Sequence, residues 1–147
     1  MDREIYATFL YLATVLAVFS CKGPGPGKGE ASLARDVRAE TQWTWDAYRT
    51  YAWGQDNLLP ISKGFSNWYS ESLSISPVDA YSTLHIMGLV EKAREIESYV
   101  TDNLDFDKDI FMKTFEVNIR ILGGLLSMYE LSGNPEVLDK AEDFGRA

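Results

Sequence analysis

The sequence predicts an all-α protein, and three observations lead to that prediction. From Ser32 onward, apolar residues recur at three- and four-residue steps, as they do on one face of a helix. No segment alternates apolar and polar residues convincingly, as a half-buried strand does. Glycine, proline and asparagine separate the helical stretches. With 147 residues, 46% of them hydrophobic, the chain has the size and composition of one globular domain with a core.

The first expected helix runs from Leu33 to Trp53, and Gly54 can end it in the left-handed conformation. A long loop is expected from Gln55 to Ile75. The second helix is expected to start at Ser76-Pro77, with Ser76 as its N-cap and Pro77 at its first helical position.

Gly88 should end the second helix, and a third is expected directly after it. Its apolar positions lie opposite a charged face, which is typical of an amphipathic surface helix. These positions recur at three- and four-residue steps and are Leu89, Ala93, Ile96, Val100 and Leu104.

A fourth helix is expected from Asp109 to Leu131, closed by Ser132-Gly133. It is apolar around nearly its whole circumference, so we expect neighbouring elements to bury it on several sides. Asn134-Pro135 should cap a last helix, which the end of the sequence at Ala147 is expected to cut off.

Composition argues against several classes of function. The formal charge is −8 and no run of Lys and Arg occurs, so we expect no nucleic-acid partner. A single cysteine and a single histidine, Cys21 and His85, provide neither an internal disulfide nor a metal cluster, and His85 is read as a packing or surface residue. Asp105, Asp107 and Asp109 lack the glycine and the terminal glutamate of a calcium loop, so we read them as a polar turn and a helix start.

The N-terminus has the profile of an export signal. The segment from Ile5 to Cys21 carries no charge and precedes a Gly/Pro run. Residues 1–21 are therefore expected to be a signal peptide, a lipoprotein signal or a membrane anchor, and residues 22–31 a linker. Ser20-Cys21 resembles a bacterial lipoprotein box, which makes Cys21 a lipidation candidate. It favours an exported bacterial lipoprotein, membrane-anchored or periplasmic, over a secretory-pathway membrane protein.

Glu116 and Arg120 interrupt the apolar fourth helix. They are four residues apart and share one face, which continues to Gly124 and then to Ser127 or Met128. One reading is structural: an ion pair, with glycines that let a neighbouring helix pack closely. The other reading is functional, because a buried carboxylate is costly and an acid facing a cavity, positioned by Arg120, would justify that cost.

The run Phe115-Glu116-Val117-Asn118-Ile119-Arg120, together with Ile121 to Ser127, resembles the signature of glycoside hydrolase family 47, the class I α-1,2-mannosidases. The resemblance covers about Gln42 to the end of the chain. It departs from the family at Ser82, where a second acidic residue is usual. The other matching runs are Trp45-Asp46-Ala47-Tyr48, Tyr51 to Gly54, Leu59-Pro60, Val78-Asp79-Ala80, Thr83-Leu84, Ile86 to Leu89, Tyr129 to Gly133 and Lys140 to Gly145.

This resemblance implies a fold and a site. Residues 32–147 would form the N-terminal part of the catalytic domain, the first helical hairpins of an (α/α)7 barrel that is incomplete in this chain. Glu116 would be the general acid, Arg120 would position it, and Asp79 would bind or support the substrate. The opposing carboxylates and the ligands of a Ca²⁺ cofactor would lie in a C-terminal part beyond this sequence.

Two functions follow as hypotheses. The first is an inverting, Ca²⁺-dependent exo-α-1,2-mannosidase that acts on α-1,2-linked mannose oligosaccharides, this chain alone being inactive. The alternative is a non-catalytic helical protein that keeps the first hairpins to bind glycans or a protein partner.

Overall fold

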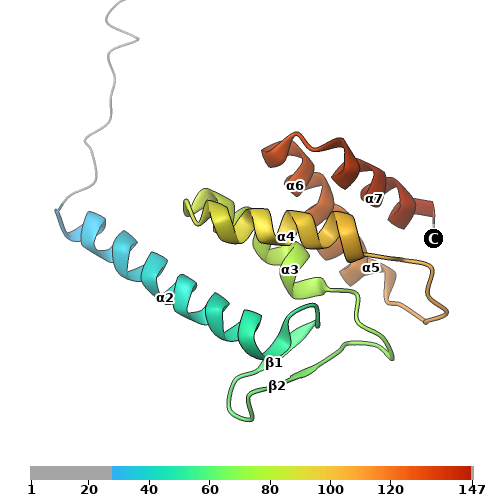
Figure 1. Cartoon of the computed structure of the whole chain (residues 1–147), viewed down its shortest axis with the longest axis horizontal. Coiled ribbons are helices and arrows are strands. Elements are labelled where there is room, and N and C mark those ends of the chain that lie inside the picture. The colour runs from blue at the N-terminus through green and yellow to red at the C-terminus, as the bar shows by residue number, and fades with distance from the viewer. Residues whose placement is uncertain (1–27, 147) are drawn as a thin grey trace, which may run out of the picture. The chain divides into compact units, whose positions relative to one another are not determined.

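A computed structural model describes residues 28–146 of the chain (Figure 1). Helices dominate these residues, which confirms the predicted all-α class. Cys21, the segment 1–21 and most of the expected linker lie outside the described residues. The elements are α2 (Lys28–Ala52), β1 (Asn57–Leu59), β2 (Gly64–Ser66), α3 (Ile75–Ile86), α4 (Val90–Asn103), α5 (Thr114–Val117), the π-helix η1 (Asn118–Leu122), α6 (Gly123–Ser132) and α7 (Pro135–Arg146).

The chain divides into two compact units, residues 1–37 and residues 38–147. The described residues of the first unit, 28–37, form the first turns of α2. This helix begins five residues before the predicted start at Leu33, so residues 28–31 of the expected linker are helical. The acidic Glu30 lies in its first turn, where a negative charge stabilises the positive end of the helix dipole. The elements described below belong to the second unit.

The core of the second unit is built mainly by α3, α4, η1, α6 and α7, and Trp45, Tyr48 and Ala52 of α2 add to it. Helix α3 packs against α4 and α6, and α7 packs against α6 and α4, so the α3–α4 and α6–α7 pairs form two helical hairpins (Figure 1). The apolar face predicted for the third helix is buried in full. The largest fully buried apolar side chains are Tyr81, Leu73, Leu84, Ile96, Ile121, Leu125, Met128, Val78, Val100 and Val137.

The predicted helix ends are confirmed where glycine supplies them. Gly54, Gly88 and Gly133 have φ values of 74°, 72° and 70°, the left-handed region that only glycine enters without strain. Asn134 caps α7 as predicted, because its Oδ1 accepts a hydrogen bond of 3.0 Å from the backbone N–H of Glu136.

The expected loop from Gln55 to Ile75 contains a short antiparallel hairpin, which the sequence did not indicate. Strands β1 and β2 pair with Asn57 opposite Ser66 and Leu59 opposite Gly64. Each strand has three residues, too few for a two-residue alternation to be recognised in the sequence.

The predicted N-cap Ser76 is wrong. Helix α3 begins two residues earlier than predicted, at Ile75 rather than Pro77, after Ser74 in the left-handed conformation with φ 55°. The Oγ of Ser76 instead donates a 2.5 Å hydrogen bond to the backbone oxygen of Asp56. The Asp56 carboxylate accepts the backbone N–H of Ile75 at 3.1 Å, so a residue far away in the sequence takes over the capping.

The predicted helix from Asp109 to Leu131 begins only at Thr114, so the helix start at Asp109 is wrong. The expected polar turn is present, since the Asp105 carboxylate accepts the N–H of Asp107 at 3.0 Å. Burial on several sides is confirmed only in part within the described residues. Helices α3 and α7 both pack against this helix, but Phe115 and Ile119 are 73% and 53% exposed. Phe111, in the segment before the helix, is 92% exposed.

Candidate active site

The structure brings together Asp79, Glu116 and Arg120, the predicted site residues that lie among the described residues. The Nε of Arg120 donates to Oε2 of Glu116 at 2.9 Å, and its Nη1 donates to Oδ2 of Asp79 at 2.6 Å. Glu116 comes from α5, Arg120 from η1 and Asp79 from α3. One guanidinium therefore links two carboxylates from separate helices.

A π-helical turn carries Arg120. Residues 118–122 form η1, which lies between α5 and α6 in one continuous helical path. A π-turn inserts one residue into an α-helix, changes the direction of the side chains around it, and is frequent at functional sites. Apolar periodicity cannot reveal such an insertion, because the buried residues on either side still recur at helical spacing.

Gly124 lets α6 approach α3 closely. A Cβ atom at this position would lie 2.7 Å from Cγ1 of Val78 and 3.1 Å from its backbone oxygen. Val78 precedes Asp79, so this contact also sets the separation between Asp79 and the helix that carries Arg120. The close packing and the ion pair of the structural reading are both present, and neither contradicts a functional role for Glu116.

Trp68 is a neighbour of the site that sequence reasoning missed. The Cζ of Arg120 lies 5.2 Å from the centroid of the Trp68 ring, within the range of a cation–π contact. The Trp68 Nε1–H donates to Oδ1 of Asn57 on β1 at 3.0 Å. Trp68 follows β2 in a segment expected to be loop, and no local pattern relates it to Arg120.

The electrostatics of the cluster keep Arg120 charged. Its hydrogen bond to Glu116, and next the one to Asp79, raise the pKa of Arg120 above its usual value. Two carboxylates face this one cation, so with Glu116 protonated the three groups are neutral and with Glu116 ionised they carry one negative charge. The exposed fractions of the side chains are 35% for Glu116, 36% for Arg120 and 44% for Asp79, so the cluster is open to solvent within the described residues.

The described residues offer no metal site. Among residues 28–146, no group of three or more His, Cys, Asp or Glu side chains could hold a metal ion. A calcium ion takes six to eight oxygen ligands, which this part of the chain does not provide. His85 lies against the ring of Tyr81, with centroids 5.8 Å apart, as expected of a packing residue.

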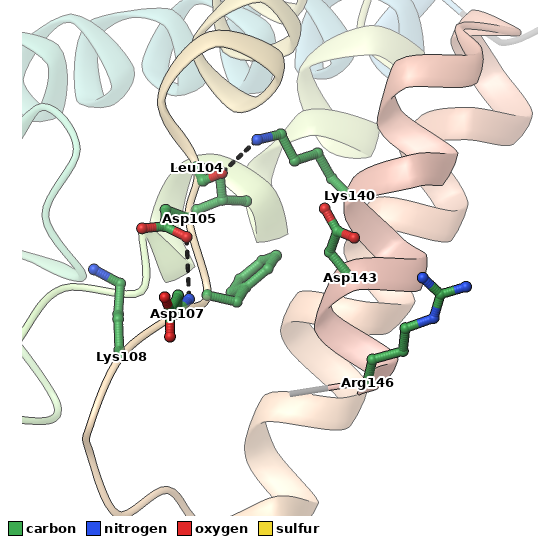
Figure 2. A pocket seen from close by; sticks show the side chains of 8 residues that line it. Leu104, Asp105, Asp107, Lys108, Lys140, Asp143 and Arg146 are labelled. Atoms are coloured by element: carbon green, nitrogen blue, oxygen red, sulfur yellow. Dashed lines mark hydrogen bonds between the residues drawn. The ribbon is translucent and has the colours of Figure 1, made fainter.

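Two hollows in the described structure lie away from this cluster. The larger, about 420 Å³, is lined by residues 104–108 and by Lys140, Asp143 and Arg146 of α7 (Figure 2). Three aspartates and three cations line it, so its charges balance and favour no class of ligand. The second, about 330 Å³, lies beside Gly54, Ser74 and Tyr99. Neither includes Asp79, Glu116 or Arg120.

The fold and the paired acid and arginine agree with a family assignment. A family model for Glycosyl hydrolase family 47 matches residues 40–147, and the chain belongs to that family. The endoplasmic reticulum mannosyl-oligosaccharide 1,2-alpha-mannosidase of Rattus norvegicus is 48% identical over 101 residues, which are 69% of this chain and 15% of the relative. Mannosyl-oligosaccharide 1,2-alpha-mannosidase MNS1 of Arabidopsis thaliana is 44% identical over 99 residues, 67% of this chain and 18% of the relative.

A solved structure extends the likeness to the fold. The alpha-1,2-mannosidase from Trichoderma reesei matches with a TM-score of 0.71 and 29% identity, over 79% of this chain and 27% of that enzyme. The helical hairpins seen here are thus part of the α/α barrel of this family. The chain spans between about one seventh and three tenths of the length of these three proteins.

Proposed function

We propose that the protein to which this chain belongs is an inverting, Ca²⁺-dependent exo-α-1,2-mannosidase of mannose-rich glycans. Family membership and relatives named as 1,2-alpha-mannosidases support the activity and the substrate class. The observation that carries the proposal is the position of Arg120 between Glu116 and Asp79, at 2.9 and 2.6 Å. Such a bridge holds a single acid in one orientation.

In this proposal Glu116 is the general acid. Arg120 binds Oε2 of Glu116, so the proton to be transferred is carried on Oε1 and passes to the glycosidic oxygen as the bond to the leaving group breaks. Asp79 binds the other side of the guanidinium and restricts its rotation, which makes Asp79 a support for the acid rather than a proton donor.

An inverting mechanism needs a second carboxylate that activates water, about 6.5–9.5 Å from the acid. We propose, from the family resemblance, that this base and the calcium ligands belong to a later segment of the complete protein. The described residues do not fit calcium, so each step assigned to them is one of proton transfer or positioning.

The test is Glu116→Gln in the protein encoded by the complete reading frame that contains this sequence. The amide keeps the shape of the side chain but cannot donate the proton, so kcat should fall by about 10²–10⁴-fold with little change in folding or in mannoside binding. Glu130→Gln, an exposed carboxylate on α6, is the matched control and should leave kcat unchanged. Turnover of Glu116→Gln within about threefold of the parent would remove Glu116 as the acid.

The alternative function, a non-catalytic glycan- or partner-binding protein, is favoured by one observation. The Glu116 side chain is about a third exposed in the described residues, and its Oε2 is held by Arg120 as in an ordinary ion pair on a helix surface. Sequencing past Ala147 separates the two functions. A reading frame that continues into further helices with acidic motifs supports the enzyme, and a true stop supports the binding protein. Calcium-dependent mannosidase activity from the purified 147-residue chain would contradict the assignment of the base to a later segment.

Export and membrane association are part of the proposal. The uncharged run to Cys21 supports export, and relatives named for the endoplasmic reticulum support the secretory-pathway alternative to a lipoprotein. Within residues 28–146, no helix has the length and apolar character required to cross a membrane. Labelling cells with a clickable fatty acid tests Cys21: label that persists in Cys21→Ala removes the lipoprotein reading, and a wholly cytoplasmic product removes export.

A further inference from the structure

A single buried carboxylate organises the segment between the hairpin and α3. Asp56 is fully buried, and its Oδ2 accepts the backbone N–H of Trp68 at 3.0 Å. Its Oδ1 accepts the backbone N–H groups of Leu73 at 2.9 Å and Ile75 at 3.1 Å, and the hydroxyl of Ser72 at 3.0 Å. The same side chain therefore fixes the backbone at Trp68 and the start of the helix that carries Asp79.

Trp68 is held by two hydrogen bonds, one at its backbone and one at its ring. The backbone N–H donates to Asp56 and the indole Nε1–H donates to Asn57, while one side of the ring contacts the guanidinium of Arg120. The side chain is not a core residue, since Trp68 is 39% exposed. A half-exposed tryptophan with two hydrogen-bond anchors can act as a rigid surface.

The guanidinium of Arg120 is held by two hydrogen bonds and by one aromatic ring. Two of its nitrogens donate to Glu116 and Asp79, and these bonds define the line along which the guanidinium lies. These two bonds alone do not define the tilt of the guanidinium plane. The guanidinium carbon lies over the Trp68 ring, 5.2 Å from its centroid, and this contact favours one tilt because a cation prefers the face of an indole.

We propose that Trp68 is a positioning residue, which acts through Arg120 to orient the acid Glu116. This inference rests on the proposed function, because it assigns Trp68 a part in the same proton transfer. The hairpin β1–β2 is then a support for the catalytic group. Asp56 and Asn57 set the place of the indole, the indole sets the tilt of Arg120, and Arg120 orients the carboxyl.

The experiment measures kcat and KM for Trp68→Leu in the complete protein. Loss of the ring should lower kcat by about fivefold, the size expected for a half-exposed cation–π contact, with KM within about twofold of the parent. Trp68→Phe keeps an aromatic face and should recover most of kcat. Trp43→Leu removes an exposed tryptophan on α2 and should change neither constant. A parent-like kcat for folded Trp68→Leu overturns the inference.

A double-mutant cycle separates positioning from direct contact with the sugar. In an Arg120→Lys background the fork of donors is already lost, so Trp68→Leu should lower kcat by less than about twofold. A full fivefold loss in that background overturns the inference, because Trp68 would then act without Arg120. Should Trp68→Leu not fold, Asn57→Ala removes only the anchor of the indole and should also lower kcat, while an unchanged kcat overturns the inference.

A crystal structure of the Trp68→Leu protein keeps the inference testable if the proposed function fails. A parent without mannosidase activity contradicts the function alone. The position of Arg120 then decides the inference: loss of its contact with Glu116 or Asp79 supports it, and retention of both contacts overturns it. An active parent whose Trp68→Leu form is equally active contradicts the inference alone.

Discussion

Two carboxylates in this chain, Asp56 and Glu116, are stabilised in opposite ways. Asp56 is fully buried and accepts hydrogen bonds from three backbone N–H groups and one hydroxyl. Glu116 is about a third exposed and is held by the single guanidinium of Arg120, which it shares with Asp79. A buried charge must satisfy nearly all of its acceptor capacity within the protein, whereas a group that transfers a proton must leave an oxygen available. Asp56 therefore stabilises the folded backbone around it, whereas Glu116 keeps its Oε1 free for the proton transfer proposed above.

The difference is tested most directly by removing Asp56. Asp56→Ala removes the acceptor of three backbone N–H groups, those of Leu73 and Ile75 being buried, so the free energy of unfolding should fall by about 3 kcal/mol or more. Chemical denaturation of the complete protein measures this change. Asp139→Ala, an exposed carboxylate on α7, is the control and should change stability by no more than about 0.5 kcal/mol. A loss of stability in Asp56→Ala no larger than that of the control would show that Asp56 is not a structural residue.

The next largest loss of stability is expected where α6 packs closely against α3, at Gly124. In Gly124→Ala the new methyl group would meet Val78 at 2.7 Å, so the helices must separate, at a cost of about 1–3 kcal/mol. Gly123→Ala is the matched control, because its nearest contact is 3.7 Å and alanine favours helix by up to about 1 kcal/mol. Thermal unfolding compares the two. Equal effects of both substitutions would show that close packing does not set the distance between Asp79 and Arg120.

Alkaline pH should lower the free energy of unfolding, because Tyr48 is buried in its protonated form. Burial raises the pKa of Tyr48 above its usual value of 10.0, with Tyr99 and Asp56 adding to the effect. The folded state therefore holds this proton more tightly than the unfolded state. The resulting stability is fully present below pH 10.0 and is lost as the pH rises from there towards the higher folded pKa.

Denaturation at a series of pH values checks this prediction. Tyr48→Phe should lower stability by about 1 kcal/mol at neutral pH, because it removes the 2.6 Å bond from the Tyr48 hydroxyl to the Gln55 backbone oxygen. Above pH 10.0 its stability should decline less steeply than that of the parent. Parallel curves would show that Tyr48 does not contribute to the alkaline loss.

The smallest expected effect on stability belongs to Asp79. Its ion pair with Arg120 is exposed to solvent, and such pairs contribute about 0–1 kcal/mol. Asp79→Asn should therefore leave the free energy of unfolding within about 1 kcal/mol of the parent while lowering kcat, because Arg120 is less firmly held. A large loss of stability would place Asp79 with Asp56 as a structural residue.

The sequence by itself determined the features that depend on neighbouring residues. Gly88 and Gly133 end helices because of their own backbone freedom, and the buried face of α4 follows from a repeat within fourteen residues. Glu116 and Arg120 are four positions apart, so their pairing was also predictable, although the π-turn between them was not.

Only the tertiary structure decided the rest. The start of α3 depends on Asp56, 19 positions before Ile75, rather than on the nearby Ser76. Asp79 reaches Arg120 across 41 positions, and Trp68 reaches it from the segment after a hairpin whose strands are too short to leave a pattern. A hydrogen-bond donor in a helix or loop bonds to whichever acceptor the packed chain brings within reach. Helix packing decides which acceptor that is, and local sequence patterns do not record helix packing.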